Sequence, residues 1–477
     1  MRLLEIVLLA VEALALVALA APLPAPMRWL RLIAPLAPLV AGVQVAVERP
    51  RWQMVPAYVL SVLLLAAWLV QRTVVRGGPA GPGWIAWVAI SLGALGLALS
   101  IALAVVFPVF RLPHPTGPHG IGTVTYHWVD AERSDVFSDD PAARREVMVQ
   151  IWYPAVNDPS APRVPYVRNA AILGPLARLV HAPTFVLRHL ALVATDAVAD
   201  APVSADARPY PLLLFSHGRG GFRAHNTAQV QDLASHGYIV ATIDHPGAAA
   251  GVEFPDGRVA PFDPRMYDPE RVGHPPFLDR ALRFLAEDVV FVLDRLTALS
   301  RAPDGILAER LDLERVGIFG VSLGGAIGVE ACHLDPRIGA CLAMDVFVPA
   351  DVLRSGLRQP LMLMTRDART MQHEGWAQAD IDETQTTVRA AFADPSSDRY
   401  LALVPGMFHG DFADLPFMTP IASRLGLSGS IAARRAHRIV TAYMLAFFDR
   451  YLKGRATTLL DGPSAEFPEV FIETRRP

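Results

Sequence analysis

Hydrophobic residues are concentrated in the first quarter of the chain, where they form long runs without charge. Residues 84–110 carry no charged side chain in 27 positions, and residues 52–71 are also uncharged. A helix needs roughly 20 residues to cross the hydrocarbon core of a bilayer, so both runs predict membrane-spanning helices. Residues 32–47 are shorter and contain two prolines. We interpret them as a weaker span between stronger neighbours.

The first apolar segment, residues 3–22, differs because it contains Glu5 and Glu12. A charge at membrane depth costs about 3 kcal/mol on insertion scales. The two glutamates are seven residues apart and share one helix face, so we expect them to face the bundle interior or to pair with arginine. A proton relay is the sharper alternative. The sequence ALAA after the apolar run also allows a cleaved signal peptide, but the glutamates and the three further spans favour a retained helix.

Four helices would put both ends of this region on the same side of a membrane. The positive-inside rule does not choose that side, because four arginines flank each end. The first group is Arg2, Arg49, Arg51 and Arg111, and the second is Arg28, Arg31, Arg72 and Arg76.

After Arg111 a Pro/Gly-rich linker, LPHPTGPHGIG, leads into a different pattern, in which short apolar runs alternate with amphipathic stretches. Such alternation predicts a mostly parallel sheet covered by helices on both faces. The predicted strands are 147–153, 211–217, 238–244, 315–320, 338–345, 360–366 and 400–406, and the predicted helices include 226–236, 278–299, 322–333 and 431–452.

Composition excludes several classes of function. The chain has 477 residues and a net charge of −3, so nothing indicates a nucleic-acid partner. Its 14 histidines do not form H-E-x-x-H or a comparable ligand spacing, so we expect no metal site. Cys332 and Cys341 are the only cysteines and give no disulfide framework, so we expect two small buried residues.

A serine stands between glycines where a predicted strand meets a predicted helix. Residues 320–324 read G-V-S-L-G, which is the G-x-S-x-G nucleophile elbow of α/β-hydrolases. The tight turn lifts the hydroxyl of Ser322 above the sheet edge, and the helix N-terminus stabilises negative charge there. The plainer interpretation is a glycine-rich turn with an N-capping serine. The flanking strand and helix favour a catalytic Ser322.

The chain is therefore expected to have an α/β-hydrolase fold preceded by an all-α region of four transmembrane helices. We divide it into a transmembrane region (1–110), a linker with the start of the hydrolase domain (111–145) and an α/β-hydrolase catalytic domain (146–477).

A serine nucleophile needs a base and a group that orients the base, and in this fold they follow in the order Ser, Asp or Glu, His. His409 comes just after the last predicted strand and is the expected base, whereas His437 falls inside the final helix. Asp345 and Asp367 both lie at carboxyl ends of strands, where sites gather in open α/β sheets. The residues alone leave the choice of acid open.

The oxyanion of the reaction needs two backbone donors. One is expected to be the N–H of Leu323, directly after the nucleophile. The other should come from the loop S-H-G-R-G-G-F at 216–222, where glycines let amides approach a ligand and Arg219 is the best backbone donor. The side chain of Arg219 is either solvated or in contact with a phosphate. His217 in this loop is interpreted as structural.

These motifs resemble the platelet-activating factor acetylhydrolase family, in its secreted and intracellular type II lineage. The resemblance spans roughly 146–454. Its densest block is 211–247, which is similar to the family's SHG-x-G-x-FR segment followed by a DLASHG helix, and GVSLGGA at 320–326 matches the family's nucleophile block.

The resemblance also bears on the open choices. It implies that the acid follows the strand after the nucleophile helix, which favours Asp345. It implies that His409 belongs to an H-x-x-F-x-D loop and that the residue after H-G, here Arg219, donates an oxyanion-hole amide. In activity it implies calcium-independent, cofactor-free hydrolysis of the short sn-2 acyl chain of phospholipids.

Two features depart from the family: the four-helix membrane part, and Arg219 where an apolar residue is typical. The apolar segment 170–194 corresponds to helices that lie on a lipid surface in the family, or else packs as ordinary core. We therefore expect an ester or phospholipid as substrate, the bilayer as partner and a multi-pass membrane location. The sequence does not decide which side of the membrane the catalytic domain faces. The alternatives are a general carboxylesterase, lipase or polyester hydrolase, and a non-catalytic lipid-binding or sensor protein.

Overall fold

The computed structural model describes residues 1–21, 23–73, 83–205, 209–266, 276–303 and 305–477. The chain forms two compact units. The first contains Met1–Phe110 together with Phe185–Val193 and Met418–Ile421, and the second contains the remaining residues from Arg111 onward. The division into three parts made from the sequence stays a prediction.

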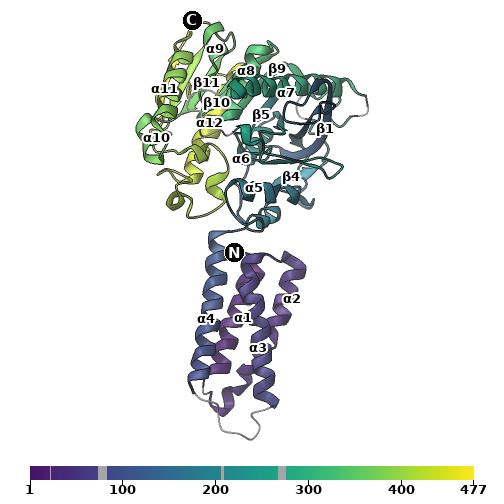
Figure 1. The fold of residues 1–477 in the computed structure, drawn as a ribbon, viewed down its shortest axis with the longest axis vertical. Coiled ribbons are helices and arrows are strands. Elements are labelled where there is room, and N and C mark those ends of the chain that lie inside the picture. The colour runs from purple at the N-terminus through teal and green to yellow at the C-terminus, as the bar shows by residue number, and fades with distance from the viewer. Residues whose placement is uncertain (22, 74–82, 206–208, 267–275, 304) are drawn as a thin grey trace. The chain divides into compact units, whose positions relative to one another are not determined.

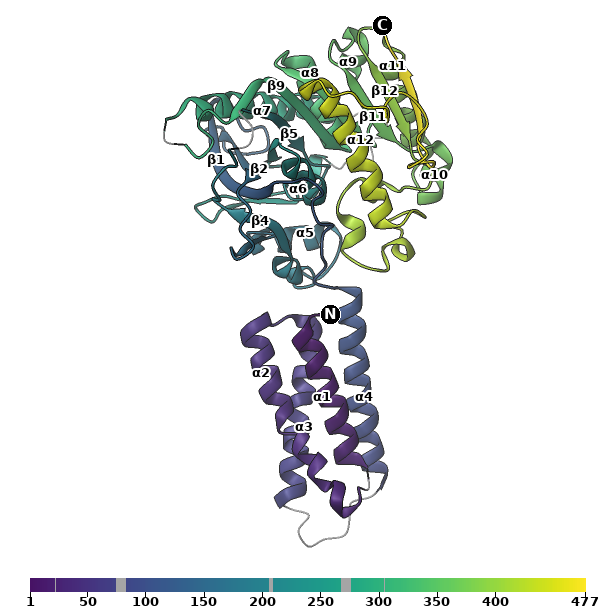
Figure 2. The same ribbon diagram turned by 180° about the vertical axis from the view of Figure 1, so that it is seen from behind.

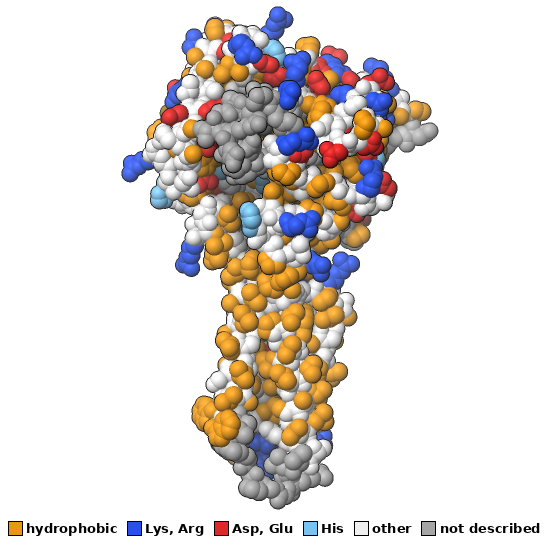
Figure 3. All heavy atoms as spheres, in the orientation of Figure 1, with side chains coloured by type: hydrophobic (Ala, Val, Ile, Leu, Met, Phe, Trp, Pro, Cys, Tyr) orange, Lys and Arg blue, Asp and Glu red, His pale blue; other side chains and the backbone are white. Residues whose placement is uncertain are grey.

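The first unit is a bundle of four helices that lie side by side (Figures 1 and 2). They are α1 (Leu3–Ala20), α2 (Leu36–Glu48, preceded by a 3₁₀ segment Ala25–Ile33), α3 (Val55–Thr73) and α4 (Gly83–Val106). All four stretches are long and apolar enough to cross a membrane. The visible face of the bundle is covered with hydrophobic side chains (Figure 3). A helix that presents apolar side chains outward needs an apolar surrounding.

The two glutamates of α1 face the bundle interior. Both carboxylate oxygens of Glu5 accept from the guanidinium of Arg51, each at 2.6 Å, and Arg2 donates to the same group. Glu12 accepts a hydrogen bond of 2.6 Å from the hydroxyl of Ser61 on α3. Both expectations from the sequence, an inward position and an arginine partner, are confirmed for Glu5, and the inward position is confirmed for Glu12.

The second unit is built on an 11-stranded sheet with the order β13-β12-β11-β10-β9-β5-β6-β2-β1-β4-β3. The six strands from β12 to β6 are parallel, and β13 and β2 join them as antiparallel neighbours. The sheet strands are β1 (Gly120–Ser134), β2 (Arg144–Ala155), β3 (Arg163–Pro165), β4 (Ala194–Ala199), β5 (Tyr210–Ser216), β6 (Ile239–Asp244), β9 (Leu311–Val321), β10 (Ile338–Met344), β11 (Leu361–Thr365), β12 (Arg399–Leu403) and β13 (Phe471–Arg475); β7 (Gly251–Glu253) and β8 (Val259–Pro261) form a separate hairpin.

Helices cover both faces of this sheet, as the alternation of strands and helices predicts. Leu212 and Leu214 of β5 pack in one core with α7 (Pro276–Arg301) and α8 (Leu323–Leu334). Leu213 and Phe215 face the opposite core, which contains α6 (Thr227–Ser235) and α12 (Ala433–Lys453). The other helices are α5 (Leu173–Leu179), α9 (Ala350–Ser355), α10 (Ala368–Glu374) and α11 (Gln378–Ala393). Because β5 is apolar on both faces, it belongs at the centre of the sheet.

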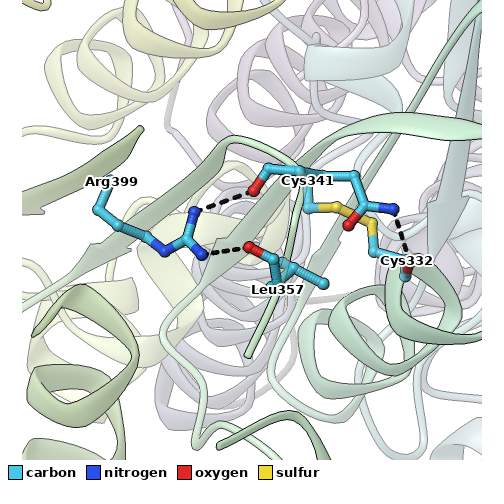
Figure 4. Close-up of a disulfide and its surroundings, with 5 residues drawn as sticks. Cys332, Cys341, Leu357 and Arg399 are labelled. Carbon is cyan, nitrogen blue, oxygen red and sulfur yellow. Dashed lines mark hydrogen bonds between the residues drawn. A yellow bond between two sulfur atoms is a disulfide. The ribbon is translucent and has the colours of Figure 1, made fainter. Parts of the chain in front are cut away.

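The two cysteines correct the sequence analysis. Cys332 in the last turn of α8 and Cys341 in β10 are both buried, as expected, but they form a disulfide (Figure 4). The chain reverses between the helix and the strand, which brings two positions nine apart to a Cα–Cα distance of 6.7 Å. This distance lies within the range that a disulfide can bridge. Sequence spacing alone does not reveal such a reversal.

Candidate active site

Ser322 lies on a strained turn between β9 and α8. Its backbone has φ 57° and ψ −131°, a positive φ that is uncommon outside glycine. A Cβ on Gly320 would lie 2.2 Å from the carbonyl oxygen of Gly324, and a Cβ on Gly324 would lie 2.1 Å from that of Ser216. Only glycine fits at either position. The turn therefore has the geometry that the G-x-S-x-G motif requires, and backbone strain of this kind is typical of functional sites.

Asp345 follows β10, the strand next to β9. Its Oδ2 atom lies 2.6 Å from Nδ1 of His409, and its Oδ1 atom accepts a hydrogen bond of 2.9 Å from the hydroxyl of Thr365. Asp367, the other acid considered from the sequence, caps the N-terminus of α10 by accepting from the N–H of Thr370 at 3.0 Å. The structure therefore brings His409 to Asp345 and gives Asp367 a local structural bond.

The Asp345 carboxyl is held in its charged form. Burial alone would raise its pKa, but the Arg366 charge and the hydrogen bonds from His409 and Thr365 outweigh burial and lower the pKa below its usual range. A carboxylate that is ionised at neutral pH can fix the tautomer of an imidazole and stabilise its protonated form. The pair thus has the chemistry of a base and its orienting acid.

Among the described residues, the His409 ring is hydrogen-bonded to Asp345 and not to the Ser322 hydroxyl. The two are nevertheless linked through the acid, because the N–H of Ser322 donates to the carbonyl of Met344 at 2.8 Å, one residue before Asp345. Catalytic hydrogen bonds are commonly long in unliganded enzymes and tighten when substrate binds.

The loop after β5 passes directly beside the nucleophile. A Cβ on Gly218 would lie 3.3 Å from Cβ of Ser322 and 3.9 Å from its hydroxyl oxygen, so only a glycine backbone fits there easily. Gly220 has φ +67° and donates its N–H to the carbonyl of Ala248 at 2.8 Å, which fixes the turn. On the other side of Ser322, Leu323 is the first residue of α8, where backbone N–H groups have no partner within the helix.

The side chain of Arg219 is exposed, and its guanidinium donates to the backbone carbonyl of Met266 at 3.0 Å. His217 is buried, with Nδ1 2.8 Å from the carbonyl oxygen of Gly218, and burial lowers its pKa to about 4. His437 is also buried inside α12, and burial lowers its pKa to about 4. Both histidines are neutral at pH 7 and occupy structural positions.

A second serine–histidine–aspartate chain lies beneath the loop, and sequence reasoning missed it. Nε2 of His245 lies 2.9 Å from the hydroxyl oxygen of Ser216, and Nδ1 lies 2.9 Å from the carboxylate of Asp288. Arg145 forms an ion pair of 2.7 Å with the same carboxylate. All four side chains are buried. Because substrate cannot reach them, we interpret this chain as the anchor of the loop that carries Arg219.

Two further acids fasten the His409 loop. Asp414 accepts from the N–H of Ala228 in the first turn of α6 at 3.1 Å. Asp411 accepts from the N–H groups of Phe408 and Gly429, each at 2.7 Å. Asp414 is the final position of the H-x-x-F-x-D pattern, so the motif could have indicated it, whereas Asp411 occupies an unspecified position of the pattern. Over the described ranges of the chain, no group of three or more His, Cys, Asp or Glu side chains is arranged to hold a metal ion.

A parallel sheet covered on both faces, with a strained serine after β9 and an acid–histidine pair after β10 and β12, defines an α/β-hydrolase. The family model "Platelet-activating factor acetylhydrolase, isoform II" matches residues 104–255 and 305–458. The chain belongs to this family, which confirms the resemblance seen in the sequence.

Individual relatives agree with the assignment. The chain is 27% identical to platelet-activating factor acetylhydrolase of Cavia porcellus, over 72% of this chain and 78% of the relative. It is 26% identical to a probable 1-alkyl-2-acetylglycerophosphocholine esterase of Arthroderma benhamiae, over 76% of this chain and 93% of the relative. A solved ferulic acid esterase from Streptomyces cinnamoneus is 33% identical, with a TM-score of 0.62, and the match covers 76% of this chain and 99% of the esterase. The chain is an enzyme that acts on ester bonds.

Proposed function

We propose that the protein is a membrane-anchored serine esterase that removes short acyl groups, above all acetyl, from the sn-2 position of phospholipids. The observation that carries the proposal is the 2.6 Å contact between His409 and Asp345 beside the strained Ser322 turn. The names of the relatives, an acetylhydrolase and a 1-alkyl-2-acetylglycerophosphocholine esterase, support this class of substrate.

In the proposed reaction, Nε2 of His409 removes the proton from the Ser322 hydroxyl as its oxygen attacks the ester carbonyl. Asp345 holds the imidazole in the required tautomer and stabilises its charged form. The backbone N–H groups of Leu323 and Arg219 stabilise the oxyanion that develops. His409 then gives the proton to the departing alcohol, which leaves an acyl-serine. Water hydrolyses this intermediate with the same groups in reversed roles. No step requires a metal or a cofactor.

The helical unit supports a bilayer as the second partner. Its four apolar helices have spanning length, and Glu5 and Glu12 of α1 are buried in the bundle interior. We therefore place the protein in a membrane as a multi-pass protein. The segment 170–194 adds apolar surface, because Val180 and Phe185 are exposed. Such surface fits a substrate that is delivered from lipid.

A general carboxylesterase is the second candidate function, and the ferulic acid esterase neighbour favours it. A substrate panel distinguishes the two. We expect 1-alkyl-2-acetyl-glycerophosphocholine to be cleaved with a kcat/KM at least about tenfold above that of the 2-palmitoyl analogue, p-nitrophenyl butyrate and methyl ferulate, which corresponds to about 1.4 kcal/mol in transition-state binding. A preference for methyl ferulate or a triglyceride over the acetyl phospholipid would favour the second candidate. The Ser322→Ala variant is the blank for every substrate.

A further inference from the structure

We propose that Arg366, together with Glu374 and Trp376, is a positioning unit that sets both the orientation and the charge balance of the Asp345–His409 pair. The proposal rests on the proposed esterase mechanism and extends it to residues that do not touch substrate. Arg366 follows β11, which lies between the strand before Asp345 and the strand before His409. Its side chain has no exposed surface.

Arg366 contacts both oxygens of the catalytic acid. Its Nε donates to Oδ1 of Asp345 at 3.2 Å, and its Nη2 forms an ion pair with Oδ2 at 3.0 Å. Oδ2 is also the atom that lies against His409. A planar guanidinium that holds both oxygens fixes the plane of the carboxylate. Together with the Thr365 hydroxyl, Arg366 therefore sets the direction in which Asp345 presents Oδ2 to the imidazole.

Glu374 closes the network into a ring. Its carboxylate forms an ion pair with Nη1 of Arg366 and accepts from the backbone N–H of His409 at 3.2 Å. The ring therefore runs from the His409 side chain to Asp345, to Arg366, to Glu374 and back to the His409 backbone. The ring and the backbone of His409 are therefore both held, by the two acids that pair with one buried arginine.

Trp376 packs against two members of this network, Arg366 and His409. The Arg366 guanidinium lies over its indole at 4.7 Å, and the His409 ring meets the indole edge to face at 5.3 Å. A guanidinium over an aromatic face is attracted by the ring's quadrupole. One aromatic side chain thus packs on both the arginine and the base, and it limits rotation of the imidazole.

The charge balance gives the unit a measurable signature. The Arg366 cation stabilises ionised Asp345 and opposes a second positive charge on His409, whereas Glu374 favours that charge. The other titratable groups near the site are Asp367 on α10, Asp411 in the turn after His409, and His225 before α6, whose pKa burial lowers to about 4. These groups are unchanged in the variants below. Removing Arg366 and removing Glu374 should therefore shift the protonation of the base in opposite directions.

The test compares Arg366→Gln, Arg366→Lys and Glu374→Gln in the full-length protein, normalised by active-site titration with a fluorophosphonate. We expect Arg366→Gln to lower kcat by between about tenfold and a hundredfold, with little change in KM, because the base is misplaced by a fraction of an ångström. The acidic limb of its pH profile should move to higher pH by about one unit, and that of Glu374→Gln to lower pH. Arg366→Lys should keep the acidic limb of the pH profile near its wild-type position but should not reach the wild-type kcat, since lysine supplies the charge without the planar fork.

Arg399 provides the matched control. It is equally buried on the neighbouring strand β12 and forms an ion pair of 2.6 Å with Asp394, away from Asp345. Arg399→Gln should lower stability without moving the pH profile. The proposal is overturned if Arg399→Gln moves the limb as Arg366→Gln does, or if Arg366→Gln and Glu374→Gln both keep the wild-type profile. If Arg366→Gln does not fold, the opposite shift in Glu374→Gln and the kcat of Arg366→Lys decide. Failure of the esterase mechanism itself would show separately, as turnover in Ser322→Ala.

We also infer, from a different observation, that the catalytic unit faces the oxidising side of the membrane. The Cys332–Cys341 disulfide is buried (Figure 4). The side-chain amide of Gln359 donates to the carbonyl of Cys332 at 2.8 Å. Disulfides persist in extracytoplasmic compartments and are rare in the cytosol. The backbone of Gln359 is held from β12, because the Arg399 guanidinium donates to the backbone carbonyl of Gln359 at 2.9 Å.

The bundle arginines do not choose between the two orientations. At the end of the bundle from which the chain continues to Arg111, Arg51 is buried and ion-paired with Glu5, but Arg49 and Arg111 are exposed. At the opposite end Arg28 and Arg72 are exposed. Exposed arginines collect on the cytoplasmic side. With two exposed arginines described at each end, the tie in the sequence count remains, and the orientation rests on the disulfide.

Single reporter thiols test this orientation in intact cells that produce the full chain. In a Cys332→Ser/Cys341→Ser background, Ser160→Cys in the second unit should react with a membrane-impermeant maleimide. Met27→Cys at the opposite end of the bundle should react only after permeabilisation. In the unmodified chain, both native cysteines should resist alkylation under denaturing conditions until a reductant is added. The reverse labelling pattern, or free native thiols, would overturn the inference.

Discussion

Nδ1 of His409 lies 2.6 Å from Oδ2 of Asp345, although the two residues are 64 positions apart in the chain. Parallel strands bring them together, because β10, β11 and β12 are neighbours and their carboxyl ends meet at one edge of the sheet. Ser322 reaches the same edge from β9. The order of strands in the sheet thus converts the sequence order Ser, Asp, His into one site.

Replacing the acid should abolish most of the activity and leave the fold intact. Asp345→Asn would keep the size of the side chain but favour the wrong imidazole tautomer, so kcat should fall by about 10⁴-fold. Asp367→Asn is the control, since Asp367 caps α10 and should change kcat by less than about twofold while costing about 1 kcal/mol of stability at most. Steady-state kinetics on the acetyl phospholipid measure both. Equal losses in the two variants would contradict the choice of Asp345.

Stability should depend on pH through Asp345. Its folded pKa is lowered from 3.8, so its contribution to the free energy of unfolding is present above pH 3.8 and is lost as pH falls through the folded pKa. The wild type should therefore lose stability more steeply than Asp345→Asn when the pH falls below about 4. Urea unfolding of the second unit at a series of pH values, followed by tryptophan fluorescence, measures the two slopes. Parallel curves would argue against a charged, stabilised carboxylate.

The glycines of the turn should not tolerate a methyl group. A Cβ at Gly320 would meet the Gly324 carbonyl oxygen at 2.2 Å, so Gly320→Ala must displace the backbone that holds Ser322. We expect a loss of more than about 3 kcal/mol in stability together with loss of activity. Gly462→Ala is the matched control, because nothing lies within 4 Å of its added Cβ. Thermal unfolding distinguishes the two, and a stable, active Gly320→Ala would show that the turn is not strained as described.

The disulfide should stabilise the fold without taking part in catalysis. Cys332→Ser/Cys341→Ser opens a loop of nine residues, for which chain-entropy arguments give a loss of about 2–3 kcal/mol. The melting temperature should fall, and kcat at 25 °C should stay near that of the wild type. Mild reduction of the wild type should reproduce the effect if the reagent reaches the buried bond. A variant with unchanged stability would contradict this role of the bond.

The sequence predicts the parts of the fold that depend on local pattern. Seven strands with continuous apolar runs and the four apolar helices are found in place, because burial on both faces and a long apolar stretch each leave a clear signature. The antiparallel strand β1 (Gly120–Ser134) and the edge strand β13 (Phe471–Arg475) were not predicted. Both mix polar and charged residues with apolar ones, since β1 is partly exposed and β13 is exposed along most of its length.

The site divides in the same way. Ser322, His409 and the two candidate acids are indicated by motif and chain order, but the contact that singles out Asp345 depends on strand order in the sheet. Arg366 and Glu374 carry no motif, because their relation to His409 exists only once β11 lies between β10 and β12. The buried hydrogen-bonded chain of Ser216, His245 and Asp288 could not be predicted for the same reason. Roles that arise from contacts across several strands cannot be read from spacing.

The central claim is that Ser322, and no other serine, attacks the ester. The direct measurement is covalent labelling of the full-length protein by a fluorophosphonate, with the modified residue located by mass spectrometry of peptides. We predict a single label on Ser322, no label and no acetyl-phospholipid turnover in Ser322→Ala, and a label that stays on Ser322 in Ser216→Ala, whose serine is buried in the second histidine chain. A label on another residue, or turnover that persists in Ser322→Ala, would contradict the account.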